Sequence, residues 1–346
     1  MPLSALFNTE FPLIQAPMAG VQDSALAVAV CNAGALGSLP CAMLNAEVLR
    51  RDLTAITAQT SRPYNVNFFC HAPAGFDAAR EAAWKTSLAP LYREFGIDTQ
   101  NTPSAPSRAP FDLAMADVLA EFKPPVVSFH FGLPSPELLA RVRSWGATVM
   151  SSATTVDEAR WLEAHGANVI ISQGLEAGGH RGMFLTDDIT TQLGTFALLP
   201  QILRAVSVPV VAAGGIADAR GIAAALKLGA AAVQIGTAYL LCPEATTTPM
   251  HRAALKSEAS RHTALTNLFT GRPARGIMNR FMREHGPMSS TAPAFPLATT
   301  AMMPLRQKAE AQGSGDFSPL WSGQNASGCK EISAAALTLE LAQGTL

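Results

Sequence analysis

Several features are scarce in this chain of 346 residues, and each absence excludes a class of protein. Only 15% of the residues are charged, and the 25 basic and 26 acidic side chains nearly cancel, so a surface for nucleic acid or for an anionic membrane is not expected. The five cysteines are widely spaced and form no CxxC pair, which argues against a disulfide framework or a zinc site and favours a reducing compartment. No apolar run approaches the ~18 residues that a membrane helix requires.

Targeting and cofactor motifs are missing as well. The first residues contain no basic stretch ahead of an apolar one, so a secretory signal is not expected and the cytoplasm is the predicted location. No group of His, Asp, Glu or Cys has metal-ligand spacing, and we predict no metal. There is no GxGxxG, which disfavours a dinucleotide bound in the manner of a Rossmann domain.

Glycine and alanine are abundant, and they recur in one pattern. Four helix-like stretches end in Gly-Ala and run directly into a β-rich segment, at 32–40, 144–153, 164–174 and 227–237. Glycine suits the left-handed residue that closes a helix, and the following alanine allows a close approach to a sheet. The segments that follow are nearly continuous apolar runs, as is typical of parallel strands buried on both faces. The pattern predicts repeated β–α units.

Eight such strands are expected, with helices between them, and this number favours a closed (β/α)8 TIM barrel. The alternative is an open, Rossmann-like sheet, which usually has fewer strands. The predicted strands are 12–16, 35–39, 64–69, 126–131, 148–153, 168–173, 208–213 and 231–236. The clearest predicted helices are 22–33, 135–145, 155–165 and 217–229, with Thr155 as a helix cap.

Two stretches exceed a minimal barrel. Residues 72–123 look like an insertion with a helix near 77–95. Residues 245–320 contain a possible hairpin at 263–277 followed by helix-like segments. We therefore expect a barrel over 1–244 that includes the insertion, a smaller, mainly helical substrate domain over 245–320, and a C-terminal segment, 321–346, that returns to the barrel.

The carboxyl ends of the strands carry the active site in barrels of this kind. Here they are rich in amides and glycine, and Glu176 is the only carboxylate noted among them. The glycine pair Gly214 and Gly215 follows the seventh strand and opens a helix, while 234–237 ends the eighth. Loops at these two positions commonly hold a phosphate through backbone N–H groups. Tight turns alone would also explain either glycine pair, but the two together favour a phosphate site.

Amide side chains near that site suit a flavin, because they provide hydrogen bonds to its ring without adding charge. Asn67 and Gln173 lie at the ends of the third and sixth strands. His180 stands on the glycine-rich loop 174–182, where we interpret it as a base or a substrate donor rather than as a loop-structuring residue. His130 lies in an apolar strand and is expected to be a satisfied core or rim histidine.

Five segments together resemble the nitronate monooxygenase family, formerly called 2-nitropropane dioxygenase-like: QAPMAG at 15–20, YNVNFF at 64–69, SQGLEAGGHRG at 172–182, VVAAGGIAD at 210–218 and QIGTAYL at 234–240. The likeness covers roughly residues 10–245 in order. The segment LWSGQNA at 320–326 resembles the terminal motif of the bacterial group, called class I, that acts on propionate 3-nitronate.

This resemblance implies an FMN enzyme that oxidises alkyl nitronates with O2 to a carbonyl compound and nitrite through a flavin semiquinone, in a detoxifying role. It implies His180 as the catalytic residue. The expected FMN contacts are Ala16, Pro17, Met18, Asn67, Gln173, Gly178, Gly179, Gly214, Gly215, Gln234, Ile235, Gly236 and Thr237. Tyr239, Arg275, Trp321 and Gln324 are candidate substrate contacts.

The partners expected on this basis are a small-molecule nitronate and O2, with the chain as a monomer or a homodimer. Two alternatives remain open from the sequence. Enoyl-acyl carrier protein reductases that use FMN share an EAGGH loop, and GRPAR at 271–275 is similar to a piece of theirs; related quinone reductases make an NAD(P)H-dependent FMN reductase the second reading. A protein that binds a phosphate ligand without catalysis is the third.

Overall fold

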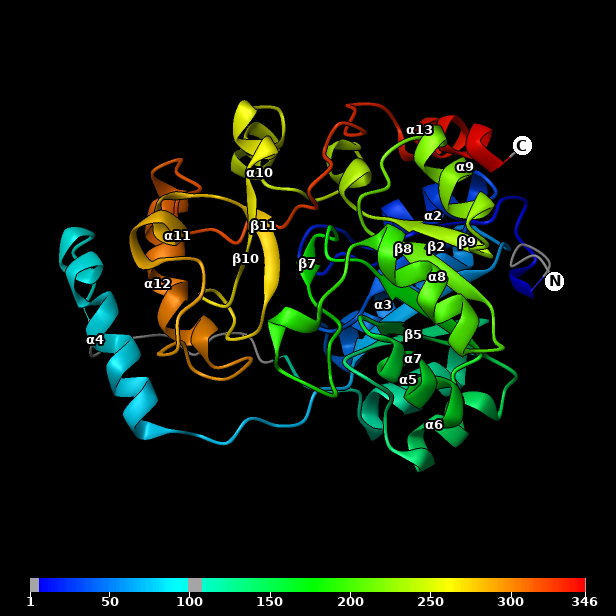
Figure 1. Cartoon of the computed structure of the whole chain (residues 1–346), viewed down its shortest axis with the longest axis horizontal. Coiled ribbons are helices and arrows are strands. Elements are labelled where there is room, and N and C mark those ends of the chain that lie inside the picture. Colours follow the sequence, from blue (N-terminus) through cyan, green and yellow to red (C-terminus); the bar gives the residue numbers. More distant parts are fainter. Residues whose placement is uncertain (1–5, 99–107, 346) are drawn as a thin grey trace.

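The fold is a closed barrel with a smaller lobe over one end. A computed structural model describes residues 6–98 and 108–345, and Figure 1 shows the barrel on the right and the lobe on the left. The eight parallel strands are β1 (Leu13–Gln15), β2 (Gly37–Pro40), β3 (Tyr64–Phe69), β4 (Val126–His130), β5 (Thr148–Ala153), β6 (Val169–Gln173), β8 (Val210–Ala213) and β9 (Ala232–Ile235). Each lies within the segment predicted for it or differs from it by one residue.

The sheet closes on itself. Its order is β1-β9-β8-β6-β5-β4-β3-β2, with parallel pairing throughout. A parallel bridge between Ile14 and Leu36 then joins the first strand to the start of the second, and Gln15 N donates to the Leu36 carbonyl over 2.9 Å. The prediction of a (β/α)8 barrel is confirmed, and the open-sheet alternative is excluded.

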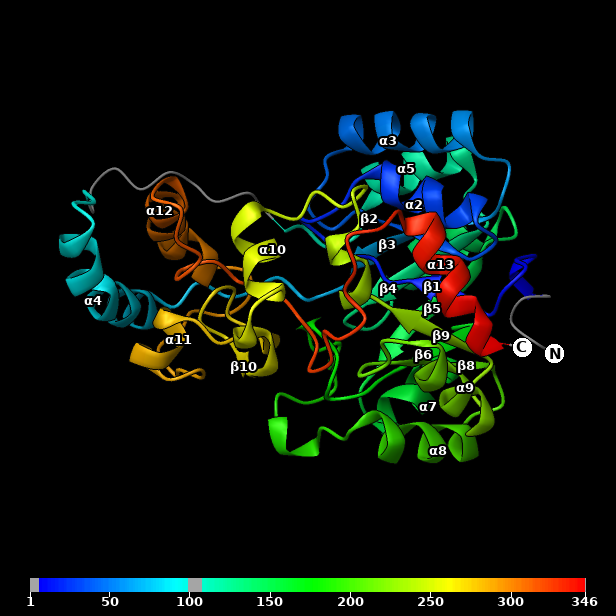
Figure 2. The ribbon, with the colours of Figure 1, turned by 90° about the horizontal axis from the view of Figure 1, so that it is seen from above.

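Helices surround the strands (Figure 2). Those on the barrel are α2 (Ser24–Asn32), α3 (Ala46–Gln59), α5 (Leu113–Phe122), α6 (Pro136–Arg143), α7 (Val156–Ala164), α8 (Thr195–Ala205), α9 (Ala219–Lys227) and α13 (Ala334–Ala342). Most begin with a side-chain cap, and Thr155 accepts a hydrogen bond from Glu158 N at the start of α7, as predicted. The last helix, α13, packs against α2 and α9 on the outside of the barrel.

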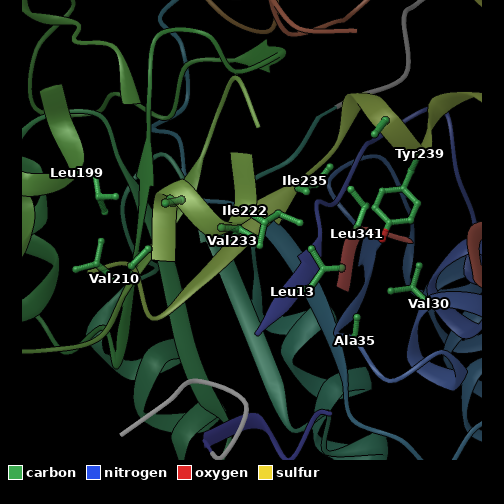
Figure 3. Close-up of a cluster of buried hydrophobic side chains, with 14 of the residues drawn as sticks. Leu13, Val30, Ala35, Leu199, Val210, Ile222, Val233, Ile235, Tyr239 and Leu341 are labelled. Carbon is green, nitrogen blue, oxygen red and sulfur yellow. The ribbon is translucent and has the colours of Figure 1, made fainter. Parts of the chain in front are cut away.

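Alternating side chains of the strands form two layers of core. Leu13, Val210 and Val233 point outward to the helices, where they pack with residues such as Ile222 and Leu341 (Figure 3). Residues one position along, such as Ile14 and Val211, fill the barrel interior. This two-sided burial explains why the strands are continuous apolar runs.

The smaller lobe combines the two stretches that exceed a minimal barrel. It contains α10 (Pro249–Leu255), α11 (Arg280–His285), α12 (Ala298–Ala311) and the expected hairpin of β10 (Thr263–Thr266) and β11 (Ala274–Ile277). The insertion contributes α4 (Ala78–Glu94), close to the predicted range, and its Trp84 and Leu88 pack with residues of α11 and α12. The division of the chain into 1–244, 245–320 and 321–346 stays a prediction.

A short strand links the two parts. β7 (Gly179–His180) lies in the loop after β6 and pairs antiparallel with β11, so Ala274 faces His180. Short 3-10 helices lie at Ile189–Thr191, Thr237–Leu241, Glu258–Arg261 and Gln343–Thr345. Within the described residues, no helix is long and apolar enough to cross a membrane.

Candidate functional site

A cavity lies where the carboxyl ends of the strands meet the smaller lobe. It contains about 1370 Å³ of empty space, part of it open to solvent. The loops after β1, β3, β6, β8 and β9 supply most of its wall, and the lobe adds His251 and Trp321. A cavity at this end of a barrel is the expected position of an active site.

Glycines line one end of the cavity. Gly214 and Gly215 have φ of +111° and +73°, a region that side-chain-bearing residues rarely adopt. Gly236 and Thr237 follow β9 beside them, and the Thr237 hydroxyl accepts a hydrogen bond from Gly323 N over 2.9 Å. The main chain is therefore exposed to the cavity at two neighbouring strand ends, as a phosphate cradle requires.

Three of the amide side chains that line the cavity lie at strand ends, and they differ in how they are bonded. Gln173 is held by the loop: its Nε2 donates to the His180 carbonyl and its Oε1 accepts from Gly182 N over 2.7 Å. Asn67 donates to the Ser128 hydroxyl over 2.9 Å. The Oε1 atom of Gln234 is buried and has no hydrogen-bond partner among the described residues. A buried acceptor without a donor is costly, and a ligand that donates to it removes that cost.

His180 sits in an aromatic pocket of the wall. Its Nε2 lies 2.9 Å from the Thr270 hydroxyl oxygen. Its ring centroid is 5.3 Å from that of Phe295, 5.6 Å from that of Trp321 and 6.0 Å from that of Phe69. Burial, assisted by the charge of Arg108, lowers the pKa of His180 well below its usual value, so the imidazole is neutral near pH 7.

Two charged residues brace the loop that carries His180. The guanidinium of Arg181 is fully buried and donates to the carbonyls of Gln173 and Gly174, both over 2.7 Å, and to Gln192. Glu176 accepts from the Thr195 N–H and hydroxyl at the start of α8. This carboxylate therefore links the loop to the start of α8 and does not line the cavity.

His130 and His251 also line the cavity. Both ring nitrogens of His130 are bonded, Nδ1 to the Ser152 hydroxyl and Nε2 to the His180 carbonyl, each over 3.1 Å. This confirms the expectation of a satisfied rim histidine. His251, which belongs to no motif in the sequence, lies on α10 with a buried Nε2 that lacks a partner among the described residues.

Most residues predicted for the site reach the cavity wall. Those that do are Ala16, Pro17, Met18, Asn67, Gln173, Gly178, Gly179, His180, Gly214, Gly215, Gln234, Gly236, Thr237 and Trp321. Ile235 does not, because it points into the core between strands and helices. The strand-end positions were predictable because the ends of parallel strands meet at one rim of a barrel.

Three of the four candidate substrate contacts lie elsewhere. Tyr239 is fully buried, and its hydroxyl pairs with that of Thr338 on α13 over 2.9 Å. Arg275 lies in β11 and donates to the Leu175 carbonyl over 3.0 Å. Gln324 is exposed to solvent. Of this group, only Trp321 lines the cavity.

Several lining residues were absent from the predicted site. Phe69 ends β3 and would have followed from the strand-end rule, since it lies two residues after Asn67. Met43 and Asn325 are contributed by irregular segments. Arg108 belongs to the insertion, and nothing in the sequence indicated that this segment reaches the cavity.

Comparisons with known proteins converge on one family. The family model described as nitronate monooxygenase matches residues 1–344. A nitronate monooxygenase from Paraburkholderia phytofirmans is 43% identical over 345 residues, covering 98% of this chain and 93% of the relative. Another from Pseudomonas aeruginosa is 42% identical, covering 98% and 97%.

Solved structures share the fold over nearly the whole chain. The nitroalkane oxidase of Streptomyces ansochromogenes superimposes with a TM-score of 0.90 at 39% identity, covering 99% of this chain and 97% of that chain. FabK from Thermotoga maritima is less similar, with a TM-score of 0.75 at 26% identity and coverage of 99% and 95%.

Proposed function

The chain belongs to the nitronate monooxygenase family, and from that premise we propose that it oxidises alkyl nitronates such as propionate 3-nitronate with O2, on FMN, to a carbonyl compound and nitrite. One observation about this chain carries the proposal. The cavity wall contains no carboxylate among its described residues, while it contains one arginine and neutral histidines. A nitronate is an anion, and such a wall attracts it without repulsion from protein carboxylates.

The residues present fit FMN. The exposed main chain at Gly214, Gly215 and Gly236, with the Thr237 hydroxyl, suits the phosphate. Asn67 and Gln173 are assigned to the edge of the ring, and the 16–18 turn to its flank. The unpartnered Oε1 of Gln234 calls for a donor from the ligand. When bound, the flavin would supply the electron acceptor that these side chains lack.

His180 then acts on the substrate as a neutral imidazole. Its Nε2 is tied to Thr270, and its Nδ1 makes no hydrogen bond within the described part of the chain. A nitronate has already lost its α-proton, so the ring has only to orient it. A neutral nitroalkane would have to give that proton to the ring. The surrounding rings of Phe69, Phe295 and Trp321 keep water away from this end of the cavity.

The proposal includes the setting of the enzyme. Its partners are a small nitronate and O2, and it works in the cytoplasm as a monomer or a homodimer. All five cysteines are free, which is compatible with a reducing compartment.

The test is anaerobic mixing of the purified protein with propionate 3-nitronate, and separately with NADH and NADPH, while the flavin spectrum is followed. We expect the nitronate to reduce the flavin, both nicotinamides to leave it oxidised, and admission of air to release nitrite with uptake of O2. Rapid bleaching by a nicotinamide with an inert nitronate would replace this proposal by the reductase reading. A colourless protein that takes up no flavin would leave only a binding function.

A further inference from the structure

We propose that Arg108 binds the two oxygens of the substrate's nitronate group and thereby selects the anionic nitronate over the neutral nitroalkane; this inference rests on the proposed function. Arg108 is the one Lys, Arg, Asp or Glu among the described residues that line the cavity. It comes from the insertion between β3 and β4, outside the minimal barrel.

The guanidinium of Arg108 is anchored at one edge. Its NH1 donates to the Thr299 hydroxyl over 3.0 Å, and that hydroxyl donates in turn to the Phe269 carbonyl over 3.1 Å. Thr299 lies on α12 and is largely buried. Because the Thr299 hydroxyl donates its proton to a main-chain carbonyl, the lone pairs of its oxygen accept the hydrogen bond from Arg108. A guanidinium has five N–H donors, and within the described residues this one bond orients the group while most of its donors stay available to a ligand.

The chemistry of the two groups matches. A nitronate is planar with two oxygens on one nitrogen, which is the arrangement that a carboxylate presents. Arginine binds such groups with two parallel hydrogen bonds, whereas lysine offers only a point charge. Burial lowers the pKa of Arg108 to about 10, so the side chain stays protonated at neutral pH.

Three other arginines, Arg181, Arg272 and Arg275, make their contacts away from the cavity. Arg181 donates hydrogen bonds to two backbone carbonyls and to Gln192. Arg272 stacks on the Phe131 ring, 4.2 Å from its centroid, and donates to the Met183 carbonyl. Arg275 donates to Leu175 and Thr263. Of these four arginines only Arg108 lines the cavity, which makes it the one positioned to meet a bound anion.

Arg108 and His180 line the same cavity, so one bound molecule can meet both side chains. Among the charges that depress the pKa of His180, that of Arg108 has the largest effect after burial. Nitronate oxygens held by Arg108 therefore bring the adjacent carbon toward the imidazole and the aromatic rings around it. The insertion and α12 would then set substrate preference, while the barrel holds the catalytic loop.

The test compares Arg108→Met, Arg108→Lys and a control, Arg306→Gln, as flavin-loaded full-length enzymes. Methionine keeps much of the apolar stem of arginine and removes the charge. Arg306 lies on α12, the helix that carries Thr299, and its charge acts on Arg108. It pairs with Glu310 and does not line the cavity. The substrates are ethylnitronate, propionate 3-nitronate and neutral nitroethane, because only the second carries a carboxylate.

For Arg108→Met we expect kcat/KM to fall by about one to two orders of magnitude for both nitronates, mainly through KM, and to change little for nitroethane. Arg108→Lys should recover part of the loss, and Arg306→Gln should resemble the wild type. Nitrate, a planar oxyanion, should protect the wild type from thermal unfolding and fail to protect Arg108→Met.

Other outcomes would overturn the inference. A loss confined to propionate 3-nitronate would place Arg108 at the carboxylate tail. Equal losses for nitroethane and the nitronates, or nitrate protection that survives in Arg108→Met, would make the residue structural. If the wild type oxidises no nitronate, the proposed function itself fails, and the nitrate measurement still decides whether Arg108 binds a planar anion.

Discussion

His180 Nε2 lies 2.9 Å from the hydroxyl oxygen of Thr270, so a residue of the barrel loop is held by a residue of the lobe. Thr270 lies in the turn of the β10–β11 hairpin, and β11 also pairs with the backbone of His180. The His180 ring, which we propose to be catalytic, is thus held where the barrel loop meets the lobe. This explains how a histidine on a glycine-rich loop keeps one orientation.

Replacing Thr270 by valine should lower kcat without emptying the flavin site. Valine keeps the volume and removes the hydrogen bond, so the His180 ring loses its orientation. Loss of one hydrogen bond of about 1 kcal/mol corresponds to about a fivefold fall in kcat with ethylnitronate, and KM should change less. Thr270→Ser, which keeps the hydroxyl, should retain most of the activity. Steady-state kinetics with flavin content measured in parallel checks this, and equal losses in valine and serine variants would refute the orienting role.

Acid should destabilise this protein through its buried histidines. Burial lowers the pKa values of His71, His130 and His251 to about 4. The unfolded chain takes up protons below pH 6.5 that the folded chain does not bind, so stability falls as the pH drops from 6.5 to about 4. Each residue contributes on the order of 1 kcal/mol per pH unit over that window.

Denaturant unfolding at several pH values measures this effect. His71, which packs among Phe69, Phe131 and Phe295, is the residue to replace, with phenylalanine. His71→Phe should flatten the fall in unfolding free energy between pH 6.5 and 4.5. His165→Gln, at an exposed position, is the control. An unchanged slope in His71→Phe would mean that the ring takes up its proton in the folded state as well.

The barrel was predictable because its physical signals are local and repeated. A Gly-Ala pair before an apolar run marks the passage from helix to buried strand, and glycines such as Gly146 and Gly166 do have positive φ at those points. In a barrel of eight strands the carboxyl ends of the strands share one rim, which predicts that Asn67, Gln173 and Gly214 lie close together.

The site residues that the sequence did not predict correctly depend on packing between distant segments of the chain. Tyr239 follows a strand end, yet the 3-10 helix that begins at Thr237 turns its ring into the core toward α13. Arg108 belongs to the insertion, and its side chain is bonded at the cavity wall to Thr299 of α12, which lies 191 residues away in the sequence. No local pattern carries that information. The cavity residues that the lobe contributes, except Trp321, therefore could not be predicted from the sequence and are identified only by the structure.

Gly178 should not tolerate even a methyl group. A Cβ added there would lie 2.5 Å from Gly323 N and 2.6 Å from the Ser322 carbonyl carbon, and both are backbone atoms that cannot move cheaply. Gly178→Ala should push the C-terminal segment away from the loop, lowering flavin content and the thermal midpoint. Gly75→Ala, where nothing lies within 4 Å of the added carbon, is the matched control. Normal flavin content in Gly178→Ala would show that this contact is not needed for the cofactor.

Gln234 allows the cofactor assignment to be tested without turnover. Its Oε1 is buried without a donor among the described residues, so it costs about 1–3 kcal/mol in the protein without ligand. Gln234→Leu removes that cost, and the apoprotein should be as stable as the wild type or more so. The same substitution removes an acceptor for FMN, which should bind about tenfold more weakly and raise the thermal midpoint less.

Gln15 on the adjacent strand is the matched control for this experiment. Its Oε1 accepts from Ser38 N over 3.0 Å and its Nε2 donates to Gln22 over 2.8 Å, so its amide is already satisfied. Gln15→Leu should therefore destabilise the apoprotein, because it removes the acceptor of Ser38 N and one of the two donors to Gln22 Oε1. In denaturant unfolding, Gln15→Leu should lower the stability of the apoprotein, whereas Gln234→Leu should leave it unchanged or raise it. If Gln234→Leu instead destabilises the apoprotein as much as Gln15→Leu does, while FMN still protects it fully, then Gln234 has a partner in solution and the flavin does not use it.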